Sequence, residues 1–243
     1  MKKMMLATAL LALTAGASLA QDVVRIGTEG AYEPYNYIDQ ATGELTGYEI
    51  ELGNELCKRA GLTCEFVQNA WDSIIPNLQS GNYDMIMAGM SITAEREEVI
   101  DFTQNYIPPA SSAYVALSAD VNVGEGAVIA AQTGTIQAGY VAESGATLLE
   151  FATPDETVAA VKNGEADAVF ADKDYLAPIA ADSNGELVVL ANEVQLGGGV
   201  GVGLRETDTE LKDKLNAAIQ SMKDDGSLNT MIKKWFGDEA VVF

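Results

Sequence analysis

One short segment carries side chains whose types and order suit the binding of a carboxylate. Residues 88–101 read AGMSITAEREEVID; Ser91 ends a buried apolar run, Thr93 can cap the helix that follows, and Arg96 falls in that helix's first turn. Free amides at a helix N-terminus favour an anion, and a guanidinium binds a carboxylate through two parallel hydrogen bonds. The alternative is that Arg96 pairs with a neighbouring acid, namely Glu97, Glu98 or Asp101.

The residue patterns of most catalytic centres are missing from the sequence. It has no histidine and only two cysteines, which removes the commonest general base and any convincing zinc site. No G-x-S-x-G elbow, P-loop or H-E-x-x-H motif occurs. Paired carboxylates are abundant but unspecific in so acidic a chain. These observations favour a binding protein over an enzyme, and we expect no cofactor and no metal.

Alternating strands and helices must position the 88–101 segment. Residues 23–28 are rich in β-branched side chains and predict the opening strand. Residues 48–60 have apolar side chains at helical spacing and end at a glycine, which predicts a helix. A strand over 63–68, a short helix over 72–79 and a buried strand over 84–88 follow. Strands separated by helices at this spacing predict an α/β fold.

The same alternation restarts in the second half of the chain. Residues 128–131 predict a strand and residues 136–143 a helix. Thr153 to Glu156 have the composition of a capping box with proline at the first helical position, and residues 168–170 predict another buried strand. Two helices with apolar stripes, opening near residues 207 and 227, close the chain. The pattern predicts a second α/β unit.

Two stretches between these units look like connections. Residues 106–112 contain two prolines, and residues 197–203 contain five glycines. If the chain crosses from one lobe to the other at 107–110 and returns near 200–202, the last two helices rejoin the first lobe. We therefore expect one lobe from residues 22–108 plus 203–243 and the other from 109–202, joined by a two-stranded hinge. The alternative is that both stretches are ordinary loops.

Composition limits the partners of the protein. The chain has 243 residues, with 36 acidic against 14 basic side chains and a formal net charge of −22. Such a charge cannot neutralise nucleic-acid phosphates, and it disfavours an anionic membrane surface. The acidity promotes solubility, and the field it creates can favour cationic ligands. The length suits two lobes of about a hundred residues each.

The first twenty residues have the pattern of a secretory signal peptide. Two lysines follow Met1, residues 4–13 are apolar, and Ser18 and Ala20 occupy the −3 and −1 positions of a cleavage site. The apolar run is too short to span a bilayer. We expect cleavage before Gln21 and export, most simply to a bacterial periplasm.

The expected export bears on whether the two cysteines form a disulfide. Cys57 and Cys64 lie seven positions apart, and an oxidising compartment permits a disulfide between them. Two buried thiols are the alternative. The pair is structural on either reading.

Several motifs in a fixed order resemble one family. The motifs are VRIGTEGAYEPYNY, GELTGYEIEL, NAWDSIIPNLQSGNYDMIMAGMSITAERE, IDFT and QTGT. Together they resemble the periplasmic amino-acid-binding proteins of ABC importers, in particular the branch that binds lysine, arginine, ornithine, histidine and opines. The resemblance implies the type II periplasmic-binding-protein fold, in which two α/β lobes close on a ligand about a two-stranded hinge. It also implies a disulfide that matches Cys57 and Cys64, an inner-membrane ABC permease as partner, and a monomer.

The resemblance also implies a set of ligand-binding residues. Arg96 would bind the α-carboxylate with help from Ser91 and the backbone at Thr135, while Asp172 and the carbonyl of Gly89 would bind the α-ammonium. The other residues would surround the ligand side chain, with an acid, two aromatic walls and a polar amide, namely Glu29, Tyr32, Trp71 and Gln137. Each has a plainer alternative: the aromatics could be core residues, Glu29 a solvated acid, and Asp172 a helix cap.

The function that follows is the capture of an amino acid for transport. A cationic amino acid is expected, because the charges of Arg96 and Asp172 cancel and Glu29 remains to bind a cation on the ligand side chain. An opine or a polar neutral amino acid is the alternative ligand. An enzyme is the alternative class, because some members of the family are dehydratases that use a carboxylic acid for proton transfer.

Overall fold

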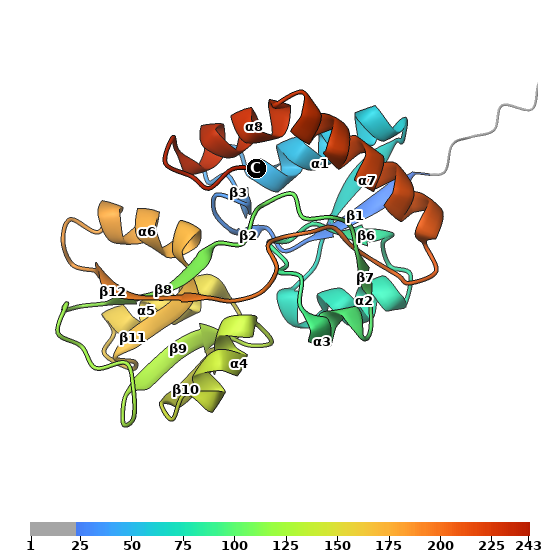
Figure 1. The fold of residues 1–243 in the computed structure, drawn as a ribbon. Helices are drawn as coiled ribbons and strands as arrows, with labels where there is room; N and C mark the ends of the chain where they lie inside the picture. Colours follow the sequence, from blue (N-terminus) through green and yellow to red (C-terminus); the bar gives the residue numbers. More distant parts are fainter. Residues whose placement is uncertain (1–22) are drawn as a thin grey trace, which may run out of the picture.

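The computed structural model describes residues 23–243, so the signal-peptide prediction for residues 1–20 lies outside the described residues. Two five-stranded sheets, each flanked by helices, form two lobes (Figure 1). This arrangement confirms the predicted α/β fold with two lobes. Within the described part of the chain, no helix is both long and apolar enough to cross a membrane.

The first lobe is built on the sheet β5-β1-β6-β13-β7. Its strands are β1 (Val24–Thr28), β5 (Cys64–Gln68), β6 (Met85–Ile86), β7 (Asp101–Phe102) and β13 (Gly203–Leu204). β1 pairs in parallel with β5 and β6, whereas β13 lies antiparallel between β6 and β7. The helices of this lobe are α1 (Tyr48–Ala60), η1 (Trp71–Ser73), α2 (Ile74–Gln79), α3 (Ala94–Glu97), α7 (Thr209–Asp224) and α8 (Ser227–Phe236).

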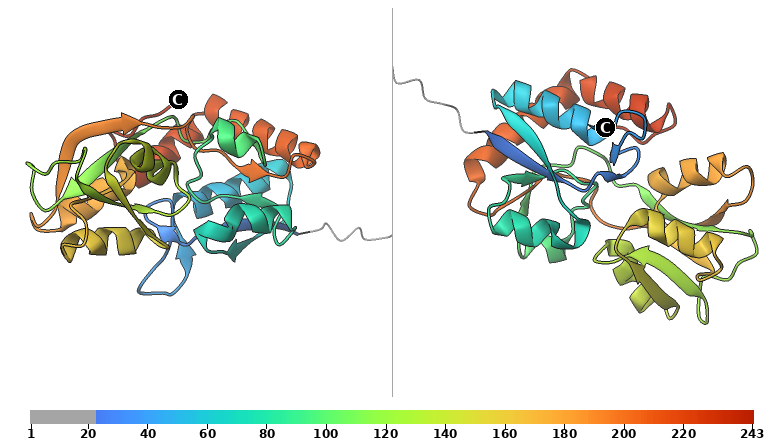
Figure 2. Two further views of the ribbon diagram at one scale, coloured as in Figure 1. Left: turned by 90° about the horizontal axis from the view of Figure 1, so that it is seen from below. Right: turned by 180° about the vertical axis from the view of Figure 1, so that it is seen from behind.

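A small antiparallel sheet fills the segment between β1 and α1. It consists of β2 (Ala31–Tyr32), β3 (Asn36–Ile38) and β4 (Leu45–Thr46). This sheet places the residues that follow β1 at the edge of the first lobe that faces the second (Figure 2).

The second lobe has the strand order β10-β9-β11-β8-β12. The strands are β8 (Ser111–Ala116), β9 (Val128–Gln132), β10 (Thr147–Phe151), β11 (Ala168–Asp172) and β12 (Val188–Gln195), and the helices are α4 (Ile136–Glu143), α5 (Pro154–Lys162) and α6 (Lys173–Asp182). β9, β10 and β11 run parallel, while β8 pairs antiparallel with β11 and β12.

Local sequence signals explain where several helices begin and end. Thr153 accepts the backbone N–H of Glu156, whose side chain accepts the N–H of Thr153, so α5 opens with the predicted capping box. α1 carries acids in its first turn and Lys58 and Arg59 in its last, an arrangement that the helix dipole favours. Leu52 and Leu56 on its inner face are fully buried. The buried stripe, more than propensity, holds such a helix in place.

The chain passes between the lobes twice, through the crossing segments 103–110 and 196–202, which lie side by side (Figures 1 and 2). The N–H of Tyr106 donates to the carbonyl of Val200 at 2.7 Å, and the N–H of Val200 donates to Ile107 at 3.0 Å. Gly199 has φ +91°, and a Cβ there would lie 2.4 Å from the carbonyl oxygen of Ile107, so only glycine fits. The connection expected over 106–112 begins and ends earlier than predicted, because β7 ends at Phe102 and β8 begins at Ser111.

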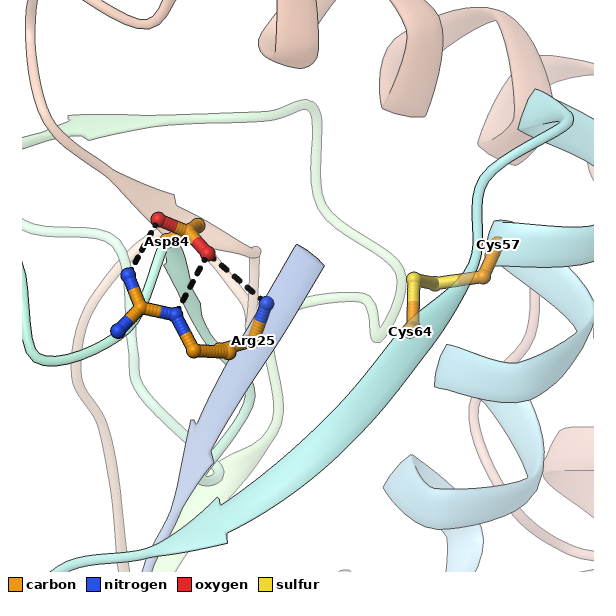
Figure 3. The surroundings of a disulfide bond; sticks show 4 residues. All are labelled: Arg25, Cys57, Cys64 and Asp84. Atoms are coloured by element: carbon orange, nitrogen blue, oxygen red, sulfur yellow. Dashed lines mark hydrogen bonds and ion pairs between the residues drawn. A yellow bond between two sulfur atoms is a disulfide. The ribbon is translucent and has the colours of Figure 1, made fainter. Parts of the chain in front are cut away.

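The predicted disulfide is present between Cys57 and Cys64, whose Cα atoms are 6.2 Å apart. It ties the last turn of α1 to the start of β5 (Figure 3). Beside it in the same lobe, the guanidinium of Arg25 donates to both carboxylate oxygens of Asp84, at 3.0 and 3.1 Å (Figure 3). This ion pair joins β1 to the turn before β6.

Candidate functional site

A cavity of about 470 Å³, including its mouth, lies between the lobes. All nine residues predicted to contact a ligand line it: Glu29, Tyr32, Trp71, Gly89, Ser91, Arg96, Thr135, Gln137 and Asp172. The first six come from the first lobe and the last three from the second, so both lobes contribute to the set.

Arg96 places a buried cation in this cavity. Thr93 caps α3 by accepting the backbone N–H of Arg96, as predicted, and the guanidinium donates to the carbonyl of Ser91 at 2.8 Å and of Gly134 at 3.4 Å. Only 9% of the residue is exposed. The guanidinium lies 5.3 Å from the ring centre of Trp71, a cation–π distance.

The alternative reading of Arg96 is wrong in the described structure. Arg96 forms no ion pair there with any of the three neighbouring acids, and the one among them that is paired, Asp101, binds Lys212 at 2.7 Å. Burial lowers the pKa of Arg96 to about 10, so the side chain still carries its charge at neutral pH. Because α3 is a single turn, its dipole adds little, and the guanidinium is the main attraction for an anion.

Asp172 places a buried carboxylate in the same cavity, at the end of β11. It accepts the hydroxyl of Tyr32 at 2.8 Å and the side-chain amide of Gln137 at 2.9 Å. Although it occupies the cap position of α6, its side chain makes no capping bond. Burial raises the pKa of Asp172 to about 6. A cation in the cavity would therefore be stabilised by this group.

Glu29 supplies a second buried carboxylate, directly after β1, and is 7% exposed. One oxygen accepts the side-chain amide of Gln132 from the second lobe at 2.7 Å. Burial raises the pKa of Glu29 to about 7, and the negative charges of Asp155 and Asp72 add to the rise. No cation compensates this carboxylate among the described ion pairs, so it is a candidate partner for a ligand cation.

Aromatic rings border the cavity on the side of the first lobe. Tyr32 stacks on Tyr175 of the second lobe, with ring centres 4.4 Å apart. Tyr175 in turn donates its hydroxyl to Asp155 at 3.1 Å. Trp71, in η1, faces Arg96. Both aromatic residues in the predicted set therefore border the cavity, and both also contact protein groups.

The remaining predicted residues are held by their local structure. Gly89 has φ +63° and a Cβ there would lie 3.3 Å from the ring of Tyr32, so the backbone approaches that ring closely. Thr135 caps α4 and donates its hydroxyl to the carbonyl of Gln132 at 2.7 Å. Ser91 is 8% exposed. Each of these presents backbone or hydroxyl groups where a ligand head group could bind.

Seven further residues line the cavity, namely Ala88, Gln132, Ile136, Pro154, Thr157, Phe170 and Ala171. The first three stand in or next to the motifs that carry the family resemblance, whereas sequence reasoning missed the last four. Thr157, in α5, is 2% exposed and donates its hydroxyl to the carbonyl of Pro154 at 2.5 Å. The predicted capping box locates the start of α5, but not the side of the helix that faces the cavity.

The electrostatics of the cavity suit a zwitterion with an additional positive charge. The guanidinium of Arg96 and the carboxylates of Glu29 and Asp172 line one cavity. Among the described contacts, both carboxylates accept hydrogen bonds from neutral donors. Among residues 23–243, no three Cys, Asp or Glu side chains gather in a way that could hold a metal ion. The cavity therefore presents charges of both signs to a ligand.

Comparison with known proteins agrees with this geometry. The model of "bacterial extracellular solute-binding proteins, family 3" matches residues 24–238. The histidine-binding periplasmic protein of Salmonella typhimurium is 31% identical over 97% of this chain and 97% of its own. A crystal structure of a periplasmic His/Glu/Gln/Arg/opine family-binding protein from Silicibacter pomeroyi, in complex with lysine, is 70% identical, covers 91% of this chain and 100% of its own, and has a TM-score of 0.88.

A second similar structure bears on the question of catalysis. It is an ancestral amino-acid-binding protein described as a precursor of cyclohexadienyl dehydratase, 31% identical, with a TM-score of 0.80 and coverage of 88% of this chain and 95% of its own. The relatives are thus named for binding, while one lies on a line that led to an enzyme.

Proposed function

The chain belongs to family 3 of the bacterial extracellular solute-binding proteins, and from this premise we propose that it captures a cationic amino acid for an ABC permease. The observation that carries the proposal is the cavity between the lobes, where the unpaired cation of Arg96 and two buried carboxylates converge. A buried charge without a partner is costly, so a ligand that forms ion pairs with all three groups gains binding free energy from each of them.

The proposed roles follow the position of each group. Arg96 binds the α-carboxylate with the Ser91 hydroxyl and the backbone at Thr135, while Asp172 and the carbonyl of Gly89 bind the α-ammonium. The side chain of the ligand lies toward the remaining residues of the set, namely Glu29, Tyr32, Trp71 and Gln137. There Glu29 receives the side-chain cation.

Lysine, arginine, ornithine and histidine are the proposed ligands. The charges of Arg96 and Asp172, which bind the head group of the ligand, cancel. The ionised carboxylate of Glu29 therefore leaves the cavity with one net negative charge, which a cationic amino acid neutralises. A neutral amino acid would leave Glu29 buried and unpaired or force it to take up a proton. The lysine in the Silicibacter pomeroyi complex supports this ligand class. An opine built on arginine, or a polar neutral amino acid, is the alternative.

Isothermal titration calorimetry with single amino acids tests the proposal. Lysine and arginine should bind more tightly than glutamine, and glutamate should bind weakest. Glu29→Gln should weaken lysine far more than glutamine, while Glu33→Gln removes the same charge from an exposed position and should change neither. Preference of the wild-type protein for a neutral or acidic amino acid would refute the cationic assignment and leave amino-acid capture standing.

Catalysis is the competing function, and Glu29 is the observation in its favour. A buried carboxyl with a pKa of about 7 suits proton transfer at neutral pH. Arg96 and Asp172, which together suit a zwitterion, favour the carrier. Turnover of a prephenate-like substrate by the purified protein would reverse the choice.

The remaining parts of the proposal concern the intact protein. We propose that the signal peptide 1–20 is cleaved and that the protein acts in the periplasm as a monomer, with an inner-membrane permease and no nucleic acid as partner. We place the lobe boundaries at 22–108 plus 203–243 and at 109–202. The two sheets support this division, because one uses strands from 24–102 and 203–204 and the other strands from 111–195.

A further inference from the structure

Glu49, the second residue of α1, carries a fully buried carboxylate that does not line the cavity. None of the described ion pairs includes it. Three neutral donors surround it: the side-chain amide of Asn36 at 2.7 Å, the backbone N–H of Gly89 at 2.8 Å, and the hydroxyl of Tyr106. Burial raises the pKa of Glu49, and the three donors act in the opposite direction. Burying a carboxylate without a cationic partner costs stability, so we expect Glu49 to have a function.

The N–H of Gly89 connects Glu49 to the head-group end of the cavity. Gly89 lines the cavity, and its N–H points back to Glu49. On its other side Gly89 lies against the ring of Tyr32, whose hydroxyl donates to Asp172 in the second lobe. Moving Gly89 would therefore disturb both its own carbonyl and the contact of Tyr32 with Asp172.

The side-chain amide of Asn36 connects Glu49 to the side-chain end of the cavity. Asn36 donates to Glu49 through its amide and accepts the backbone N–H of Gly30 through its carbonyl oxygen, also at 2.7 Å. Gly30 directly follows Glu29. The orientation of Asn36 is thus fixed by two partners of opposite polarity, and it fixes the backbone beside Glu29.

The third donor connects Glu49 to the crossing segments. Tyr106 lies in the segment 103–110, and its backbone pairs with Val200 of the other segment. Its hydroxyl shares one carboxylate oxygen of Glu49 with the N–H of Gly89. One oxygen atom therefore contacts both a residue that lines the cavity and a residue of the crossing segments.

We propose that Glu49 is a positioning residue that holds Gly89 and the Glu29 loop in their binding geometry and couples both to the crossing segments. This inference rests on the proposed function, because it assumes an amino acid in the cavity. Glu49 acts through other residues and touches no ligand. Its loss is expected to weaken ligands at equilibrium and to speed their release, since the closed cavity would be less well organised.

Two variants test different hydrogen bonds of this network. Glu49→Gln keeps the shape but turns one oxygen into a donor, which must face either Asn36 or the pair formed by Gly89 and Tyr106. Tyr106→Phe removes only the donor from the crossing segment. Tyr83→Phe is the matched control, because its buried hydroxyl in the same lobe donates to the carbonyl of Ile74 and Tyr83 does not line the cavity.

The experiment measures the Kd and the dissociation rate of radiolabelled lysine at 25 °C, on variants shown by circular dichroism to be folded. Glu49→Gln should raise the Kd about ten- to a hundredfold, as expected when a buried hydrogen-bond partner is lost. Tyr106→Phe should raise the dissociation rate severalfold, and Tyr83→Phe should lower the melting temperature without changing either constant.

Wild-type binding constants in both Glu49→Gln and Tyr106→Phe would overturn the inference while leaving the proposed function intact. If Glu49→Gln does not fold, Tyr106→Phe alone decides, and an unchanged dissociation rate refutes the coupling. An equal loss of binding in Tyr83→Phe would reduce Glu49 to a stabilising role. Failure of the wild-type protein to bind any amino acid would instead overturn the proposed function, and the inference with it.

Discussion

Protonation of Glu29 should control how strongly the cavity binds a cationic amino acid. Burial, with Asp155 and Asp72 nearby, raises the pKa of Glu29 to about 7, so a large fraction of this carboxyl is neutral at neutral pH. A ligand cation beside it would lower that pKa toward the ordinary value. Binding then releases a proton, and the affinity rises as the pH rises through 7.

The expected size follows from the fraction of Glu29 that is ionised. With a pKa of about 7, about a tenth is ionised at pH 6.0 and about three-quarters at pH 7.5. The affinity for lysine should therefore increase about eightfold over this interval, which is about 1.2 kcal/mol. At pH 7, binding should release about half a proton. Asp172, with a pKa of about 6, also contributes at the acidic end, but it acts on every α-amino acid alike.

Calorimetry at pH 6.0 and 7.5, repeated in buffers with different heats of ionisation, measures both the affinity and the proton release. Glutamine serves as the reference ligand, because the contribution of Asp172 cancels in the ratio of the two affinities. That ratio should lose its pH dependence in Glu29→Gln and keep it in Glu33→Gln, in which an exposed acid is replaced. A lysine-to-glutamine ratio that is constant with pH in the wild-type protein would refute the pairing of Glu29 with the ligand cation.

Three further predictions follow from the same structure. Arg96→Ala should abolish measurable amino-acid binding, at a cost of about 2–5 kcal/mol, with the fold retained by circular dichroism; a near-wild-type Kd in calorimetry would refute the carboxylate role. Replacing Cys57 and Cys64 by serine should lower the free energy of unfolding by roughly 2.5 kcal/mol in denaturant titrations, with ligand affinity kept; equal stability would contradict it. Without ligand, Glu29→Gln should raise the melting temperature more at pH 8 than at pH 5, because the folded pKa of Glu29 lies above the unfolded one and the resulting loss of stability grows as the pH rises toward 7; an equal effect at both would exclude a charge origin.

The helices were predictable where local signals define them. α1 and α4 have the predicted bounds, and Thr153 forms the predicted capping box. These signals act within a few residues, so they can be read without knowledge of the tertiary structure.

The strands were less predictable, because their partners decide them. The small sheet of β2, β3 and β4 has strands of two or three residues, too short for an alternating pattern to be recognised. β8 begins within a stretch that carries two prolines and looks like a loop, yet its pairing with β11 and β12 places it inside the second sheet. The edge strand β7 and its neighbour β13 likewise form only where the chain returns.

The same division holds for the candidate site. Arg96 and Asp172 stand next to predicted element boundaries, so sequence patterns could place them near a cavity. The contact of Gln132 with Glu29, the stacking of Tyr175 on Tyr32 and the network of Glu49 join segments far apart in the sequence. No local pattern contains that information.

The double crossing of the chain has a consequence for the order in which the protein can fold during export. Within the described sheets, β7 pairs only with β13, and β13 is reached near residue 203, so the first sheet cannot close until nearly the whole polypeptide has emerged. The second sheet uses strands from residues 111–195 alone and can close earlier. Pairings so distant in sequence slow folding, because a long loop must be ordered before they form. β1 can pair early with β5 and β6, because all three strands lie within residues 24–86, but the edges of β6 and β7 that β13 joins stay unpaired until residue 203 has emerged. This delay leaves those two edges exposed to misassembly for the longest time.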